Sequence, residues 1–257
     1  MRTRIALVSA ALACGLARAG TAEAAAFNVK PTQIYLSAKA RSGMLGIRNE
    51  SAESLRFQLS VFAWNQTAAG EMQLLPTQDI VFFPALLSLA PGEERKIRVG
   101  TTVPGGPTER SYRIFVEELP PAVRAKDAAG KTEIRVLTRM GVPIFIAPAV
   151  AAPTSAAVGQ IEPKALRGDK LSFEVRNTGS VHFQIKQARV LGLGASKENL
   201  FERSVPGWYV LAGGSRVFDV EPPKGVCAKT KTLAFKVETD KTTLATELET
   251  RGGICGP

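Results

Sequence analysis

The sequence predicts an all-β protein made of two β-sandwich domains, and three features of its pattern support this class. Apolar residues recur at every second position, most regularly at Leu55, Phe57, Leu59 and Val61, which is the period of a strand with one buried face. Turn-prone residues, such as Ala-Pro-Gly at 90–92, separate the apolar runs. No stretch shows the 3.6-residue period of a long amphipathic helix. Short strands separated by turn signals are typical of sandwiches.

The first half of the chain contains a succession of such runs. The predicted strands are residues 27–36, 43–48, 55–64, 80–84, 86–89, 95–99, 111–120 and 131–148. Strands of this number and spacing favour a sandwich of the immunoglobulin-like type. Residues 147–155, which are small and include prolines, have the composition of an interdomain connection.

The second half repeats the theme in shorter strands. They are residues 171–176, 181–185, 188–191, 208–211, 216–220 and 233–237. Each half has one strand that ends in Arg-Asn before a polar turn, at Asn49 and at Asn177, which suggests two related modules. We therefore predict an N-terminal domain over residues 25–150 and a C-terminal domain over residues 151–257.

Residues 1–24 have the composition of a secretory signal peptide. Two arginines near the start precede an apolar run, and the small residues Ala22 and Ala24 fit a cleavage site. Cleavage after Ala24 comes just before the first predicted strand, and Ala19 and Ala26 are alternative sites. The apolar run is too short to span a bilayer comfortably, and no later run is longer, so we expect export without stable membrane insertion.

Charge and cysteine content narrow the partners of the exported chain. The net charge of +10 falls to +8 when three arginines and one glutamate leave with the signal peptide. Because the basic residues are scattered and the protein is exported, we expect no nucleic-acid partner. After Cys14 is removed, Cys227 and Cys255 remain, and in an oxidising compartment such a pair most simply forms a disulfide. Two cysteines and one unrelated histidine, His182, are too few for a zinc site.

Catalytic residue patterns are missing from the sequence. His182 has no second histidine or cysteine partner that would make a nucleophile and base, so we predict a structural or surface role for it. Glu117 and Glu118 are neighbours on a strand and should point to opposite faces, which does not suit an acid/base pair. We predict a protein that is not an enzyme and uses no cofactor or metal. Five aromatic residues suit either a core or a ligand groove: Trp64, Phe82, Phe83, Trp208 and Tyr209.

The strand over residues 131–148 is the longest apolar strand in the chain. Apolar residues recur at every second position, from Ile134 and Val136 to Ile146, while the charged residues lie on the other parity. Pro143 cannot donate to a neighbouring strand, so one side of the strand should be an unpaired edge at that point. A long apolar edge is tolerated when it is covered or used in binding. Two interpretations stay open, an ordinary core strand and a strand that binds a partner.

Three segments of the chain form a recognisable set: residues 112–121, the strand over residues 134–148 with its Gly-Val-Pro-Ile-Phe sequence, and Asn177-Thr-Gly after a strand of the second half. Together with the signal peptide and the two sandwiches, they resemble the PapD-like periplasmic pilus chaperones. The Gly-Val-Pro-Ile-Phe version is similar to the archaic, spore-coat-protein-U-like branch. The resemblance implies two immunoglobulin-like domains in an L shape and a chaperone/usher protein of fimbrium biogenesis and cell wall organization. It also implies pilin or coat-protein subunits and an outer-membrane usher as partners, and a periplasmic location.

The resemblance further implies a mechanism, donor-strand complementation, for the long strand. A pilus subunit is an immunoglobulin-like fold that lacks one strand, and the chaperone lends its own strand to fill the gap. Backbone groups pair with the subunit while alternate side chains fill its groove. The expected donor residues are Thr132, Ile134, Val136, Thr138 and Met140.

The best-known relatives anchor the subunit's C-terminal carboxylate with an arginine on the first strand and a lysine late on the donor strand. The nearest positions here are Gln33 and Gly141 or Pro143, none of which is basic. We therefore expect Arg113 and Arg139, on neighbouring strands, to provide the anchor, because a guanidinium can bind a carboxylate through two hydrogen bonds. The alternative is that both are ordinary solvated arginines.

Two other classes of function remain as alternatives at this stage. A secreted protein of two sandwiches can also be an adhesin or a carbohydrate-binding module. A hydrolase would require a site hidden among scattered carboxylates, which the pattern does not indicate. Capture of a pilus subunit distinguishes the chaperone from both.

Overall fold

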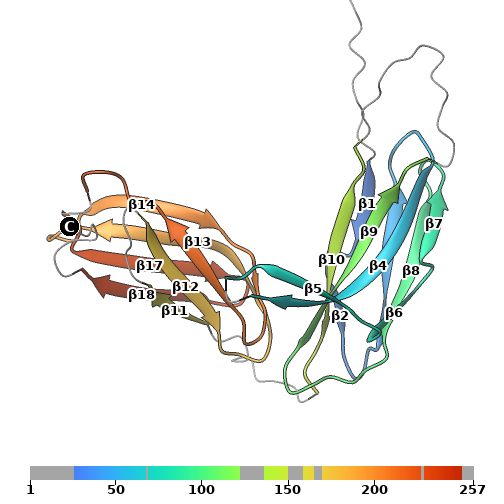
Figure 1. The fold of residues 1–257 in the computed structure, drawn as a ribbon, viewed down its shortest axis with the longest axis horizontal. Helices are drawn as coiled ribbons and strands as arrows, with labels where there is room; N and C mark the ends of the chain where they lie inside the picture. Colours follow the sequence, from blue (N-terminus) through green and yellow to red (C-terminus); the bar gives the residue numbers. More distant parts are fainter. Residues whose placement is uncertain are drawn as a thin grey trace, which may run out of the picture.

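The computed structural model describes residues 26–67, 69–121, 136–149, 159–164, 170–226 and 229–250. Strands supply the architecture of these residues and no α-helix occurs among them, which confirms the predicted all-β class. Residues 27–146 contribute the strands of one sandwich and residues 159–249 those of a second. Figure 1 shows the two sandwiches meeting at an angle, as expected for an L shape.

The N-terminal sandwich packs two sheets around one core. The four-stranded sheet has the order β1 (Phe27–Lys30), β3 (Ser42–Asn49), β8 (Glu94–Thr101), β6 (Ile80–Phe83). The six-stranded sheet has the order β2 (Ile34–Leu36), β10 (Arg139–Ile146), β9 (Arg110–Leu119), β4 (Leu55–Gln66), β5 (Met72–Pro76), with β7 (Leu86–Leu89) also paired to β4. Alternate side chains of both sheets are fully buried between them, including Ile47, Phe57, Ile97, Ile114 and Ile144. The period-two pattern of the sequence thus marks the faces that form this core.

The first predicted strand, residues 27–36, is divided in the structure. β1 pairs antiparallel with β3 in one sheet, and β2 pairs parallel with β10 in the other. Pro31 lies between them and has no N–H for a ladder, so a single uninterrupted strand is disfavoured there. This first segment therefore links the two sheets and sends β2 to the side of β10.

The C-terminal sandwich is built in the same way from a three-stranded and a five-stranded sheet. The first has the order β11 (Gly159–Pro163), β12 (Leu171–Asn177), β16 (Ser215–Val220). The second has the order β14 (Asn199–Pro206), β13 (Phe183–Leu193), β17 (Thr232–Thr239), β18 (Thr243–Glu249), with β15 (Tyr209–Val210) paired to β13. Its core includes Phe173, Phe183, Val190, Phe235 and Val237, and it is separate from the first core.

The structure corrects two features of the predicted strands. Residues 181–185 and 188–191 were predicted as two strands, but β13 continues through them, with a register shift between Ile185 and Gln187 that breaks the alternation. Four strands, β5, β11, β14 and β18, were not predicted. Most of their side chains are exposed or half-buried, so backbone pairing defines them without a strong apolar pattern.

Asn49 and Asn177 hold equivalent corners of the two sandwiches. Both are fully buried, and each side-chain amide donates to two carbonyl oxygens. Asn49 Nδ2 bonds to the carbonyls of Glu53 and Leu89 at 2.7 and 3.0 Å. Asn177 Nδ2 bonds in the same way to Val181 and Val210, at 2.9 and 3.0 Å. The Arg-Asn repeat of the sequence therefore corresponds to a shared structural role.

Replacing Asn177 with alanine should lower the free energy of unfolding by about 2–4 kcal/mol, because the carbonyls of Val181 and Val210 lose their buried partner. Urea denaturation followed by circular dichroism measures this. The exposed Asn199, changed to alanine, is the control and should alter stability by less than about 0.5 kcal/mol. Equal stability of the two variants would contradict the capping role.

Several predictions concern residues outside the described part of the chain. These are the signal peptide at residues 1–24, the domain boundary at residues 150 and 151, the donor residues Thr132 and Ile134, and Cys227 and Cys255. None of the described residues forms a helix long and apolar enough to cross a membrane.

Candidate functional site: the donor strand and the interdomain cleft

The strand predicted over residues 131–148 is shorter in the structure, where β10 runs only from Arg139 to Ile146. β10 pairs antiparallel with β9, with Arg139 opposite Glu117. The Thr138 carbonyl still accepts a hydrogen bond from the Glu118 N–H at 2.9 Å. Residues 136–138 lie at the end of β9 and have no other described strand beside them, so they make no ladder of their own.

One side of β10 is an edge over most of its length. β2 pairs with β10 only at Ile144, Phe145 and Ile146, so among the described strands none covers that side from Arg139 to Pro143. Pro143 therefore lies where a missing N–H costs no ladder bond, which confirms the edge predicted from its residue type. The unpaired side leaves backbone groups available to another strand.

The even-numbered side chains of this segment change from buried to exposed toward its beginning. Val142, Ile144 and Ile146 are buried in the N-terminal core. Met140 is 36% exposed and Val136 is 62% exposed, although they continue the same alternation. The face that forms the core thus extends past the sandwich as an apolar surface.

The odd-numbered side of β10 faces the C-terminal sandwich, since Phe145 packs near Tyr209, and Arg113 of β9 lies on the same side; we call this interdomain surface the cleft. Arg113 on β9 is opposite Pro143 and is only 7% exposed. Its Cζ lies 4.3 Å from the centre of the Trp64 ring and 5.3 Å from that of Trp208, which comes from the C-terminal sandwich. Among the described residues no carboxylate forms an ion pair with it, and its buried Nε has no hydrogen-bond partner. Burial lowers the pKa of the Arg113 guanidinium from its ordinary value.

Arg139 lies on the same face in a different environment. Its side chain is about half exposed, and its Nε is 3.5 Å from a carboxylate oxygen of Glu117. Its guanidinium also lies over the Phe115 ring, 4.0 Å from the ring centre. The two predicted anchors are therefore unequal, because Arg139 already has an anionic neighbour.

Gly141 provides space between these arginines. A Cβ at this position would lie 2.9 Å from Phe115 Cε1 and 3.3 Å from Arg113 Nη1. The Arg113 side chain therefore extends close to the backbone of β10. A side chain at Gly141, one of the two positions nearest to the expected donor-strand lysine, would compete for this space.

The base of the cleft is an aromatic cluster shared by both sandwiches. It consists of Trp64 and Phe145 from the first sandwich and Tyr209 and Leu211 from the second, all buried, with Leu74 packed against them. The sequence did not decide whether Trp64 and Tyr209 belong to a core or to a ligand groove. The structure places both in this joint between the sandwiches. Figure 1 shows the β4–β5 hairpin reaching toward the C-terminal sandwich.

Two glutamines of the first sandwich bond directly to Tyr209. Gln33 Nε2 donates to the Tyr209 hydroxyl at 2.5 Å, and Gln66 Nε2 donates to the Tyr209 carbonyl at 2.8 Å. The Leu211 N–H in turn donates to Gln66 Oε1 at 2.9 Å. Gln33, which occupies the place of the expected first-strand arginine, thus fixes the joint between the domains.

His182 and Glu109 form a second link across the joint. A Glu109 carboxylate oxygen is 2.6 Å from His182 Nδ1 and accepts a hydrogen bond from the His182 backbone N–H at 3.1 Å. The imidazole is 2% exposed and stacks on Phe145, with ring centres 3.7 Å apart. His182 therefore has a structural role, as the sequence predicted.

Replacing Glu109 with alanine should expose the His182 amide to exchange, because both of its contacts to the carboxylate are lost. We expect the local protection to fall by about 2–3 kcal/mol, the range for hydrogen bonds to a charged group. Hydrogen–deuterium exchange at the His182 amide measures this, with the exposed Glu71 changed to alanine as the control. Unchanged protection in the Glu109 variant would show that the link is dispensable.

The carboxylate pair considered for catalysis is separated as expected. Glu117 is half exposed on the cleft face, while Glu118 is buried on the opposite side of β9, 1% exposed. No group of three or more potential metal ligands occurs within the described ranges.

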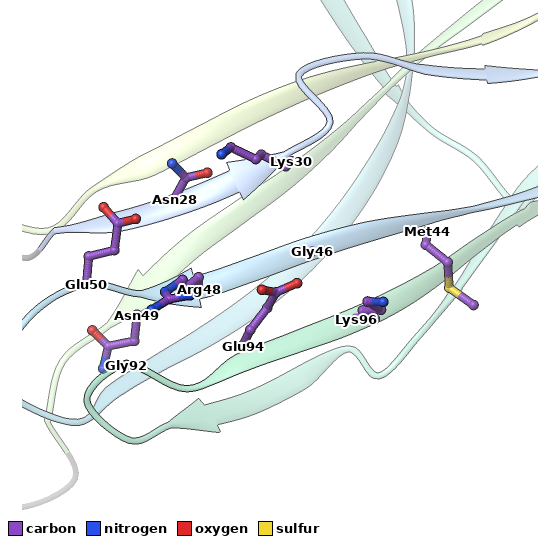
Figure 2. A pocket seen from close by; sticks show the side chains of 10 residues that line it. All are labelled: Asn28, Lys30, Met44, Gly46, Arg48, Asn49, Glu50, Gly92, Glu94 and Lys96. Atoms are coloured by element: carbon purple, nitrogen blue, oxygen red, sulfur yellow. The ribbon is translucent and has the colours of Figure 1, made fainter.

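The outer face of the four-stranded sheet carries a mixed charged and apolar surface. A hollow of about 570 Å³ lies there. Figure 2 shows the side chains that line it, among them the basic Lys30, Arg48 and Lys96 and the acidic Glu50 and Glu94. Beside it, four large apolar side chains are 53–77% exposed: Met44, Val81, Phe83 and Leu86. We call these four residues the outer apolar patch. Phe83, one of the aromatics considered for a groove, thus lies in neither the core nor the cleft.

The N-terminal part of the sequence matches a known protein family. Residues 26–152 match the family described as pili and flagellar-assembly chaperone, PapD N-terminal domain. Residues 26–152 therefore form a PapD-family N-terminal domain. A sequence search of curated proteins gives no significant match.

Solved structures similar to this PapD-family chain include several pilus chaperones. A chain of the CsuC–CsuE chaperone–tip adhesion subunit complex from archaic Csu pili of Acinetobacter baumannii has a TM-score of 0.56 and 18% identity, over 76% of this chain and 91% of that one. A chain of the Salmonella enterica SafA pilin–SafB chaperone complex has values of 0.58 and 13%, over 88% and 98%. The E. coli chaperone DraB has 0.53 and 18%, over 89% and 100%. At identities this low, the structural similarity shows a shared fold and nothing further.

The fold of chaperone/usher pilus assembly chaperones is thus established for this PapD-family chain. The family consists of periplasmic assembly chaperones, a class that is not enzymatic, and the chain is accordingly not an enzyme. Two of these similar structures are complexes of such a chaperone, one with a tip adhesion subunit and one with a pilin.

Proposed function

We propose that the chain is a periplasmic chaperone of a chaperone/usher pathway. It binds pilus or coat subunits by donor-strand complementation and delivers them to an outer-membrane usher. The observation that carries the proposal is the unpaired, apolar side of β10, whose core-forming face continues into the exposed Met140 and Val136. A subunit that lacks a strand needs both backbone partners and apolar side chains, and this segment offers both.

The same proposal assigns the donor residues. Thr132, Ile134, Val136, Thr138 and Met140 share the parity of the buried Val142 and Ile144, so they would enter the subunit groove from one face of the strand. Each aliphatic side chain buried in that groove contributes roughly 1.5–3 kcal/mol.

For the anchor of the subunit's C-terminal carboxylate, the contacts favour Arg113 over Arg139. Arg113 is buried in the cleft, keeps its charge at neutral pH and has no anionic partner among the described residues. An isolated buried charge is costly, and a carboxylate would offset that cost. Arg139 already faces Glu117, so it contributes less to carboxylate binding, by adding positive electrostatic potential beside the site.

Delivery to an usher requires a surface that stays free while a subunit occupies the donor strand. Met44, Val81 and Phe83 of the outer apolar patch lie on the four-stranded sheet. Leu86 lies on β7, which pairs with β4, and β4 and β9 separate it from β10 in the six-stranded sheet. Exposed apolar groups beside basic residues are typical of protein–protein contact surfaces. This patch is our candidate for the second partner.

The remaining assignments concern the mature form and its branch. We propose a signal peptide at residues 1–24, an N-terminal domain at 25–150, a C-terminal domain at 151–257 and a disulfide between Cys227 and Cys255. The Gly141-Val-Pro-Ile-Phe145 sequence supports the archaic branch, as does the absence of a basic residue at Gln33 and at Gly141 or Pro143.

Periplasmic co-expression with a candidate pilin encoded nearby tests the function. We expect a one-to-one complex on size exclusion and rapid loss of the subunit when the chaperone is omitted. A folded chaperone that leaves the subunit free would overturn the proposal and return the two-sandwich binding protein as the better hypothesis.

A further inference from the structure

The surroundings of Arg113 come from both domains. Trp64 belongs to β4 of the N-terminal sandwich, and Trp208 precedes β15 of the C-terminal sandwich. Their ring centres lie 4.3 and 5.3 Å from the Arg113 Cζ. These are the two tryptophans of the whole sequence, so both indoles of the chain contact one guanidinium.

The C-terminal sandwich holds Trp208 firmly in place. Its carbonyl accepts a hydrogen bond from the Ile185 N–H at 2.9 Å. Gly207, just before it, lies so close to Ile185 that a Cβ there would collide with the Ile185 carbonyl oxygen. The Trp208 ring meets the Tyr209 ring edge-on, at 5.6 Å and 89°. The backbone of Trp208 is therefore fixed by its own domain, and its indole, 38% exposed, packs against Tyr209 of the same domain.

Tyr209 transmits this position to the N-terminal sandwich. It bonds to Gln33 and Gln66, and its ring packs edge-on against Trp64 at 5.3 Å and 81°. The distance from Trp208 to Arg113 thus depends on how the two sandwiches are joined. A change in the joint would separate Trp208 from the guanidinium while leaving Trp64 in place.

We propose that Trp208 is a positioning residue of the carboxylate site, so that the C-terminal domain completes the site in which Arg113 binds the subunit's terminal carboxylate. The inference rests on the proposed function and extends it. Aromatic faces stabilise a guanidinium without using its N–H groups, because the attraction is to the π-system. The N–H donors at the edge of the guanidinium then stay available for two parallel bonds to a carboxylate.

The ligand class is therefore a chain-terminal α-carboxylate, and the role of Trp208 is to act through Arg113. If Trp208 touched the bound chain itself, it would stabilise a peptide with an amidated end as much as one with a free acid. A residue that orients and stabilises the guanidinium changes only the preference for the acid. This difference separates the two roles.

The experiment uses the full mature chain and two synthetic peptides that match the last strand of the candidate pilin encoded nearby, one a free acid and one a C-terminal amide. Isothermal titration gives the ratio of the two dissociation constants for wild type, Trp208→Leu, Trp208→Phe and Arg113→Gln. We expect the acid preference to fall about tenfold in Trp208→Leu, with amide binding unchanged. Trp208→Phe, which keeps an aromatic face, should retain most of the preference.

Each outcome bears on a different step. Loss of the acid preference in Arg113→Gln together with a wild-type ratio in Trp208→Leu would overturn the role of Trp208 and leave the anchor intact. An equal loss of acid and amide binding in Trp208→Leu would also overturn it, since Trp208 would then contact the peptide or support the fold. A wild-type ratio in Arg113→Gln would remove the proposed anchor, and the inference with it.

Discussion

Replacing Arg113 with glutamine is expected to weaken the chaperone–subunit complex by more than about 100-fold. Breaking a buried ion pair by removing one partner costs about 3–5 kcal/mol, since the remaining charge is left without compensation. Glutamine keeps most of the length and a polar end, so the change removes the positive charge more than the packing against Trp64. Surface plasmon resonance with immobilised subunit measures the loss as a faster dissociation.

Arg139→Gln is the matched control for this prediction. It removes the same charge from the same cleft face, but its guanidinium is half exposed and already faces Glu117. We expect a change of less than about fivefold, in the range of exposed ion pairs. If Arg139→Gln costs as much as Arg113→Gln, both arginines bind the carboxylate. If only Arg139→Gln weakens the complex, the assignment of the anchor to Arg113 is wrong.

Much of the fold could be predicted from the sequence, because most strands have one face in a core. The first half of β4 and all of β17 alternate between buried and more exposed side chains, and their apolar period is visible in the sequence. β5 and β18 have no buried face, so their pairing leaves little trace in the residue pattern. The predicted strand boundaries were wrong where backbone pairing alone decides them. β10, for example, starts where it begins to pair with the last residues of β9.

The site was predictable in part, for a related reason. Parity along one strand relates Val136 to Ile144, and strand order brings Arg113 beside β10, so both could be nominated from the sequence. The contact of Trp208 with Arg113 could not, because it depends on how two separately folded sandwiches meet. The sequence indicated that the two tryptophans belong either to a core or to a ligand groove. It did not specify which groups they would contact.

The donor strand gives the second large prediction. Replacing Val136 with aspartate should abolish the subunit complex, because a charged carboxylate would enter an apolar groove in place of an aliphatic side chain. The lost burial contributes roughly 1.5–3 kcal/mol and the desolvation of the charge adds several more, so we expect a loss above about 1,000-fold. Val136 is 62% exposed in the free chaperone, so the substitution should leave its own stability within about 0.5 kcal/mol of wild type.

Leu137→Asp is the control that tests the direction of the strand. Leu137 is adjacent, 41% exposed and of opposite parity, so its side chain would point away from the groove. Size exclusion of the co-expressed pair should show a complex for Leu137→Asp and none for Val136→Asp. The reverse result would mean that the odd-numbered side chains are donated, and the register of the strand would have to shift by one residue. Retention of the complex in both variants would mean that subunit binding does not use this strand, since one of the two side chains must enter the apolar groove and a buried charge there is costly.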